Sequence, residues 1–269
     1  METFYFGGEP RLFGVLHEPQ LDTDGDDAGA PGVVVLCAPL WREAIRAHRV
    51  LRQLGVRLAK LGLSVLRFDY TGAGDSAGDT EDGDVATWLG DIAAAVDEAK
   101  RTKGVVRVTL LGLRFGATLA ALAAAARGDV ERLVLWEPVR EGRRYLAEGF
   151  AEQAAWRERY ATWRRLRRSE VVDGGDEILG YRVTRAMRAS IAEVDLARLP
   201  RTAPHVLLIE RTAPDATGGL PVVLVGGGAR VQHEVLDEAE IWKQHPTEGM
   251  AGAKHTQDVI AGWLARSAA

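Results

Sequence analysis

Five short apolar runs, separated by segments long enough to form helices, constrain the fold of this chain more than any other feature. The runs are rich in β-branched residues and carry few polar positions, which is typical of strands buried on both faces of a parallel sheet. Such alternation requires crossover connections and predicts an α/β layered fold. The runs are 32–39 (GVVVLCAP), 63–70 (LSVLRFDY), 105–113 (VVRVTLLGL), 130–139 (VERLVLWEPV) and 204–211 (PHVLLIER).

Helical spacing of apolar residues predicts helices between these runs, and alternation predicts further strands at both ends of the chain. Residues 218–228 (GGLPVVLVGGG) fit either a strand or a helix. The Arg-rich helical stretch 140–196 interrupts the rhythm, so we expect a cap inserted into a core of 1–139 and 197–269. The other expected elements are a hairpin in 1–20, helices at 43–61, 85–100 and 115–127, a strand at 229–237 and a closing helix at 256–268.

Composition excludes several classes of protein. The chain has 34 basic and 38 acidic residues and a net charge of −4, so no nucleic-acid partner is expected. A single cysteine, Cys37, rules out an intrachain disulfide and a cysteine-rich zinc site. The N-terminus lacks the pattern of a signal peptide, and no apolar run reaches the roughly 18 residues of a membrane span. We therefore expect a cytoplasmic protein without membrane insertion.

One short stretch, LLGLRFGATLA at 110–120, is typical of the sharp strand-to-helix turn that carries a nucleophilic serine in the motif G-x-S-x-G. Both glycines are present as Gly112 and Gly116, an apolar strand precedes them and an alanine-rich helix follows. The position of the serine is taken by Arg114. The pattern therefore predicts the turn, but the serine nucleophile of the motif is absent from it.

With its neighbouring motifs, this stretch resembles an α/β-hydrolase of the serine aminopeptidase-like group, and most closely the exosortase-system-associated hydrolases. That subgroup also tends to carry Arg in the turn. The resemblance therefore implies the α/β-hydrolase fold, with a mostly parallel sheet flanked by helices and an inserted helical cap, and argues against a serine mechanism. It covers most of 32–210 through CAPLWREAIRAHRV, LRFDYTGAGDSAGD, LLGLRFGATLA, LWEPVREGRRYL and GYRVTRAMRASIAEVDL.

Arg114 offers only hydrogen-bond donors, so it cannot act as a nucleophile or base. At a helix N-terminus it could bind a carboxylate or phosphate of a substrate in bidentate fashion. The alternative is an internal salt bridge, with Glu43 or Glu137 as the acceptor. We expect Glu43 beside Arg114 in the substrate pocket, with Leu40, Trp41 and Phe115 supplying backbone donors for an oxyanion.

Candidate catalytic groups lie at the ends of strands and near the C-terminus. Glu137 follows the run ending in LVLW, and Asp215 follows 204–211; either could be the acid of a triad, although Asp215 also fits a turn. His255 is expected directly before the last helix as the base, with a solvated histidine as the alternative. Cys37 would be a nucleophile only with a lowered pKa, and a buried apolar role is the alternative.

The remaining motifs are weaker evidence for a binding or catalytic site. Residues 72–77 (GAGDSA) match a dinucleotide fingerprint formally, but acidic residues follow and the helix starts too late, so no cofactor is expected. No metal-binding pattern is present either. In the cap, an aromatic stripe flanked by arginines could form a lid over the substrate or pack as an ordinary amphipathic helix. The stripe comprises Trp156, Tyr160, Trp163 and Leu166.

Two functions remain open at this stage. The first is an enzyme acting on an ester, thioester or lactone-type acyl group of an anionic small molecule, with water activated by His255 and a carboxylate, or with attack by Cys37. The second is a catalytically inactive binding or accessory protein that keeps the pocket. The oligomeric state is open, with a dimer as one option.

Overall fold

An eight-stranded sheet forms the centre of the structure, a computed structural model that describes residues 1–19, 32–104, 107–164, 176–213, 218–243 and 252–266. The strand order is β1-β2-β4-β3-β5-β6-β9-β10. Strands β1 and β2 are antiparallel neighbours at one edge, and the pairs from β4 to β10 are parallel. The bounds are β1 Glu2–Phe6, β2 Leu12–His17, β3 Gly32–Cys37, β4 Ser64–Phe68, β5 Arg107–Leu113, β6 Arg132–Trp136, β9 His205–Glu210 and β10 Arg230–Val235. The predicted mostly parallel sheet is confirmed.

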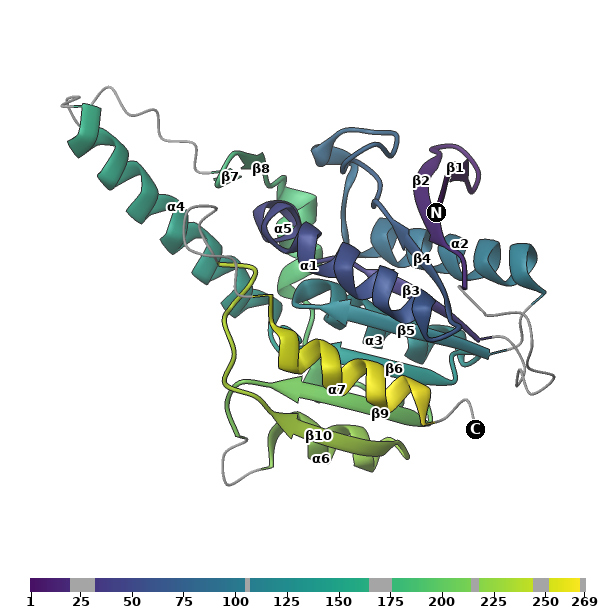
Figure 1. The fold of residues 1–269 in the computed structure, drawn as a ribbon. Coiled ribbons are helices and arrows are strands. Elements are labelled where there is room, and N and C mark those ends of the chain that lie inside the picture. Colours follow the sequence, from purple (N-terminus) through teal and green to yellow (C-terminus); the bar gives the residue numbers. More distant parts are fainter. Residues whose placement is uncertain (20–31, 105–106, 165–175, 214–217, 244–251, 267–269) are drawn as a thin grey trace.

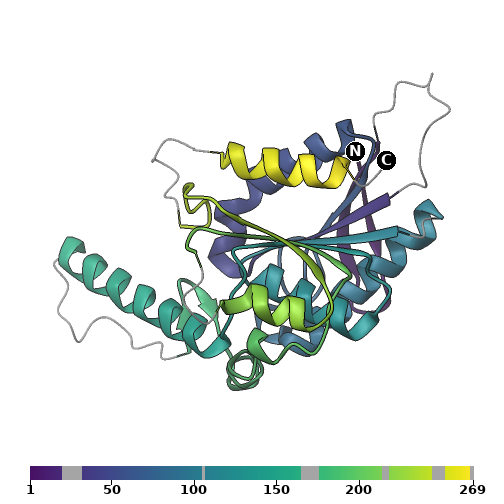
Figure 2. The same ribbon diagram turned by 90° about the horizontal axis from the view of Figure 1, so that it is seen from below.

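Helices cover both faces of this sheet (Figures 1 and 2). Helices α1 (Trp41–Lys60) and α7 (Lys254–Ala265) lie on one face. Helices α2 (Val85–Lys103), α3 (Phe115–Arg127) and α6 (Gly219–Gly226) lie on the other. The ambiguous stretch 218–228 is thus a short helix, because its apolar residues Leu220 and Leu224 pack into the core one helical turn apart.

Between β6 and β9 the chain leaves the sheet. It forms α4 (Gly142–Arg164), the hairpin β7 (Glu177–Ile178) and β8 (Tyr181–Arg182), and α5 (Arg185–Ala192). Short 3-10 helices, η1 (Thr80–Asp82) and η3 (Leu196–Arg198), lie in connecting segments. A bridge between Glu141 and Asp195 joins the two ends of the insertion, and we propose the cap of 140–196 as a separate unit on that basis. Figure 1 shows α4 projecting away from the sheet.

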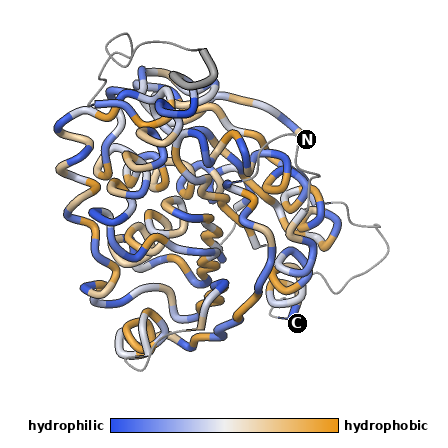
Figure 3. Tube along the Cα trace, turned by 90° about the vertical axis from the view of Figure 1, so that its left-hand side faces the viewer, coloured by the Kyte–Doolittle hydropathy of each residue, from blue (hydrophilic) through white to orange (hydrophobic). Residues whose placement is uncertain are grey.

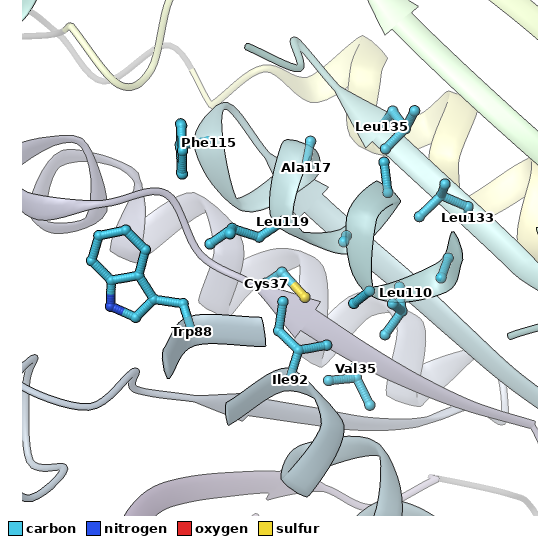
Figure 4. Packing of buried hydrophobic residues seen from close by; sticks show 14 of the residues in the cluster. Val35, Cys37, Trp88, Ile92, Leu110, Phe115, Ala117, Leu119, Leu133 and Leu135 are labelled. Carbon is cyan, nitrogen blue, oxygen red and sulfur yellow. The ribbon is translucent and has the colours of Figure 1, made fainter. Parts of the chain in front are cut away.

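Side chains alternate between two apolar layers along each central strand. Val35 and Leu110 face α2 and α3, whereas Leu36 and Leu111 face α1 and α7. Because both faces are covered, nearly every strand position is apolar, which explains the unbroken runs in the sequence. Figure 3 shows hydrophobic stretches distributed along the whole described trace, and Figure 4 shows the packing of one layer. In the described part of the chain, no helix combines the length and the apolar character that a membrane crossing requires.

Candidate functional site

The predicted turn between β5 and α3 is present, with Arg114 at its tip. Arg114 has φ 55° and ψ −125°, a conformation that costs a non-glycine residue about 1–3 kcal/mol. Both glycines are required by close backbone approach. A Cβ on Gly112 would lie 2.4 Å from Cα of Ala117, and one on Gly116 would lie 2.2 Å from the carbonyl oxygen of Ala38. The sequence therefore builds a strained turn that presents one side chain above the sheet.

The side chain of Arg114 forms an internal ion pair with Glu43. Its Nε donates to Oε1 of Glu43 at 3.1 Å, and the hydroxyl of Tyr145 donates to Oε2 at 3.2 Å. The guanidinium carbon lies 5.1 Å from the ring centroid of Trp242, and Nη2 lies 4.0 Å from Oε2 of Glu148. Of the two acceptors that the sequence leaves open, the structure pairs Arg114 with Glu43. The terminal nitrogens of Arg114 donate no hydrogen bond to the described residues.

Burial makes this ion pair costly to form, because both charged groups lose most of their contact with water. The exposed fractions of the Arg114 and Glu43 side chains are 14% and 17%. Burial raises the pKa of Glu43, and the charge and hydrogen bond of Arg114 offset only part of this rise. Burial also lowers the pKa of Arg114, but the carboxylate of Glu43 outweighs that effect, so its pKa is raised. Arg114 is therefore a permanent cation in this site.

A pocket of about 400 Å³ opens above the turn, between α1, α4 and the segment after β10. We call it the elbow pocket. No histidine lines it among the residues that the structure describes. Its walls include Leu40, Trp41, Glu43, Arg114, Tyr145 and Trp242.

Two helices begin near Arg114. Trp41 and Phe115 are the first residues of α1 and α3, where N–H groups have no acceptor within their own helix. Trp41 stacks on Tyr145 with ring centroids 5.9 Å apart, and Phe115 stacks on the same ring at 5.1 Å. Leu40 and Trp41 line the elbow pocket, whereas the buried Phe115 does not, and their role as oxyanion donors stays a prediction.

Glu137 does not line the elbow pocket. It follows β6 with φ 49°, and it lines a hollow of about 10 Å³ that shares Trp242 with that pocket. Its Oε1 is buried without a hydrogen-bond partner in the described structure. Burial raises the pKa of Glu137, and a backbone hydrogen bond from Arg211 and the charge of Arg114 offset part of this rise.

Cys37 does not line the elbow pocket. Cys37 is fully buried among residues such as Val35 and Ile92 (Figure 4), and burial raises the pKa of its thiol to about 12. A thiol in that state is a poor nucleophile. Its packing matches the alternative of a small apolar core residue. Asp215 lies outside the described residues.

His255 does not precede the last helix; it is the second residue of α7, and that expectation was wrong. The helix starts earlier because Glu238, distant in sequence, caps it. Glu238 accepts the N–H groups of His255 at 3.0 Å and Thr256 at 2.7 Å. The His255 residue is exposed and does not line the elbow pocket.

The aromatic stripe of the cap is only partly described. Trp156 stacks on Tyr160 with centroids 5.2 Å apart, and Trp156 is 41% exposed. Neither residue lines the elbow pocket. The side chain of Trp163 and all of Leu166 lie outside the described part of the chain.

Among the pocket residues that were not predicted from the sequence, Tyr145 in the first turn of α4 and Trp242 in the segment after β10 contact the Arg114–Glu43 pair. Their only sequence signal is position, since both follow the carboxyl ends of sheet strands, where ligand-facing residues concentrate.

Comparisons with known proteins agree with this architecture. The family model described as "Serine aminopeptidase, S33" matches residues 34–204, more than half of the chain. The esterase Pf2001 of Pyrococcus furiosus has a TM-score of 0.64 at 16% identity, over 98% of this chain and 90% of that one. Est1E of Butyrivibrio proteoclasticus, solved with ferulic acid, has a TM-score of 0.62 at 16% identity over 97% of both chains. At these identities the solved structures show the fold alone, and no curated protein matches the sequence.

The ion pair at the turn gives a direct prediction. Glu43→Gln removes the charge that compensates Arg114, so we expect the free energy of unfolding in urea to fall by about 3 kcal/mol. Arg101→Gln is the control, because Arg101 is 72% exposed in its ion pair with Glu98. That change should leave the free energy of unfolding nearly unchanged, because ion pairs exposed to water contribute little. Equal losses in the two variants would show that the Arg114–Glu43 pair contributes no more than a surface contact.

Proposed function

The chain belongs to the S33 serine aminopeptidase family of α/β-hydrolases, and on that premise we propose that its elbow pocket binds an anionic small molecule through Arg114 without forming an acyl-enzyme. The observation that carries this proposal is the identity and pairing of the residue at the tip of the turn. Arg114 is a largely buried cation that donates one hydrogen bond, from Nε to Glu43, while its Nη2 lies 4.0 Å from Glu148, beyond hydrogen-bond distance.

An anion fits this position for three reasons. The guanidinium can bind a carboxylate or phosphate in bidentate fashion. The N–H groups at the starts of α1 and α3 favour negative charge. The walls of the elbow pocket carry one more basic than acidic side chain: Arg42, Arg46, Arg114 and Lys243 against Glu43, Glu148 and Glu152.

Several observations argue against a covalent intermediate. Arg114 has no nucleophilic atom, and the raised pKa of Cys37 keeps its thiol protonated at neutral pH. His255 does not line the elbow pocket, so a histidine base for a bound hydroxyl is lacking among the described lining residues. A hydrolase fold can retain its pocket after losing its chemistry.

Glu137 favours a second candidate function: hydrolysis of an ester, thioester or lactone-type acyl group by directly activated water. A carboxylate with a raised pKa is a stronger general base near neutral pH. Glu137 lies close enough to Arg114 for the guanidinium charge to affect its pKa. Glu137 lines a hollow that shares Trp242 with the elbow pocket but does not line that pocket, so this candidate also requires a path for water from Glu137 to the bound acyl group.

Calorimetric titration with benzoate and with benzamide, its neutral isostere, tests anion binding. We expect the wild type to prefer benzoate, and Arg114→Gln to weaken benzoate binding by about tenfold or more while leaving benzamide unaffected. Arg127→Gln, at the opposite end of α3, is the matched control. Equal affinity for the two compounds, or an unchanged benzoate affinity in Arg114→Gln, would overturn the proposal.

Nitrophenyl ester and thioester assays on the same proteins distinguish hydrolysis by activated water from binding without turnover. Turnover lost in Glu137→Gln but kept in His255→Ala and Cys37→Ala would favour hydrolysis by activated water. No turnover above the spontaneous rate, together with benzoate binding, supports the binding protein.

A further inference from the structure

A second and larger cavity adjoins the elbow pocket. Its volume is about 610 Å³, compared with about 400 Å³ for the elbow pocket. The start of α1, the loop after β4 and the hairpin of the cap enclose it. Five aromatic residues are among those that line it, and we call it the aromatic chamber: Trp41, Phe68, Tyr70, Trp88 and Tyr181.

The two cavities share a wall. Leu40 and Trp41 line both, so the indole of Trp41 lies at their boundary. The cap hairpin also extends along both, because Leu179 lines the elbow pocket and Tyr181 lines the aromatic chamber. Trp41 and Leu179 have φ of 53° and 50°, conformations that are rare for residues with large side chains. Strain of this kind is typical of ligand-contacting segments.

The electrostatic character of the aromatic chamber differs from that of the elbow pocket. No lysine or arginine is among its described lining residues, which include Asp69 and Asp75. Oδ2 of Asp69 accepts the N–H of Asp75 at 3.0 Å, so one carboxylate oxygen is used within the loop itself. The floor is apolar, with Phe68 and Tyr70 ring centroids 5.0 Å apart and Trp88 next to Tyr70 at 6.5 Å. Such a chamber disfavours an anion and accommodates a neutral aromatic group.

We infer that the aromatic chamber is a second subsite of the elbow pocket, and that the ligand is bipartite. Its carboxylate or phosphate lies on Arg114, and a neutral aromatic group extends past Trp41 into the chamber. This inference rests on the proposed function for its anionic end and on the chamber alone for its aromatic end.

A series of phenyl carboxylates of increasing length tests the inference by calorimetry: benzoate, 4-phenylbutyrate and 8-phenyloctanoate. Affinity should rise with length once the ring can pass Trp41. Ala44→Phe fills the chamber from α1, and it should lower the affinity for 8-phenyloctanoate about tenfold while benzoate binds as before. Ala151→Phe fills the elbow pocket from α4, and it should weaken all three ligands.

The outcomes separate the two ends of the ligand. If Ala44→Phe leaves the affinity for the longest carboxylate unchanged while Arg114→Gln weakens it, the chamber inference is overturned and the proposed function stands. If Ala44→Phe weakens binding and Arg114→Gln does not, the proposed function fails and the aromatic subsite stands. If none of the three compounds binds, both fail.

An independent observation concerns β10, the last strand of the sheet. The N–H groups of Arg230 and Leu236 donate to β9 and its flanking residue, at 2.8 Å to Pro204 and 2.9 Å to Glu210. Because successive residues of a strand direct their backbone groups to opposite sides, Val231 and His233 direct theirs outward. Among the described residues no strand pairs with this side of β10. An unpaired edge of this kind is a template for another strand.

The charges along β10 are complementary to a second copy of the same strand. In antiparallel pairing about a twofold axis through Gln232, Val231 exchanges hydrogen bonds with His233 of the partner subunit. Arg230 then lies opposite Glu234 of the partner subunit, and the reciprocal pair forms on the other side of the axis. Both are non-hydrogen-bonded positions, where Cα atoms approach to about 4.5 Å and opposite charges stabilise pairing.

Helix α6 adds apolar surface at the same edge. Val222 and Val225 are each 58% exposed on α6, which packs on β10. A twofold axis perpendicular to the sheet keeps both copies of α6 on one face, beside each other. We propose that β10 and α6 form the interface of a twofold-symmetric dimer with a continuous sheet.

Reversing the charges of Arg230 and Glu234 tests the proposed dimer. Light scattering after gel filtration should show a dimer for the wild type and about tenfold weaker association for Arg230→Glu and for Glu234→Arg, because like charges then face each other. The double variant Arg230→Glu/Glu234→Arg should restore the dimer. Arg266→Glu, at the end of α7, is the control, and thermal melting verifies that each variant folds. A wild type that stays monomeric, single variants that still dimerise, or a double variant that does not recover would each overturn the proposal.

Discussion

The ion pair between Arg114 and Glu43 is the interaction on which the site depends. It places a permanent cation at the tip of a strained turn, where the fold presents a single side chain to the elbow pocket. Taking two charges out of water costs several kcal/mol per ion, and only close pairing with further hydrogen bonds offsets that cost. Tyr145 supplies one such bond, and the ring of Trp242 lies beside the guanidinium. The residues that stabilise the charge of Arg114, namely Glu43, Tyr145 and Trp242, also line the elbow pocket.

The two cavities differ in the charge and the polarity of the side chains that line them. The elbow pocket holds the cation and helix N-termini, which suit an anion, whereas the aromatic chamber has aromatic walls and acidic residues, which suit a neutral ring. Trp41 takes part in both, as a backbone donor at the start of α1 and as the wall between them. A ligand that satisfies both environments must carry its charge at one end.

The fold could be predicted because its signals are local. The apolar runs reflect strands covered on both faces, and Gly112 and Gly116 reflect backbone contacts that a Cβ would block. The site was less predictable because it depends on contacts between distant segments. Glu238 caps α7 from outside the helix, which moved the helix start ahead of His255. Burial that raises the pKa of Cys37 depends equally on tertiary packing. Tyr145 and Trp242 had no sequence signal beyond following a strand.

The strand-to-helix turn is intact, while among the described residues neither His255 nor Cys37 lines the elbow pocket beside Arg114. Mass spectrometry of Arg114→Ser after treatment with a fluorophosphonate tests this most directly, because that reagent labels serines activated by a neighbouring base. We expect no adduct on an Arg114→Ser protein whose thermal melting shows that it folds. A stoichiometric adduct at position 114, lost again when a histidine is replaced, would contradict it.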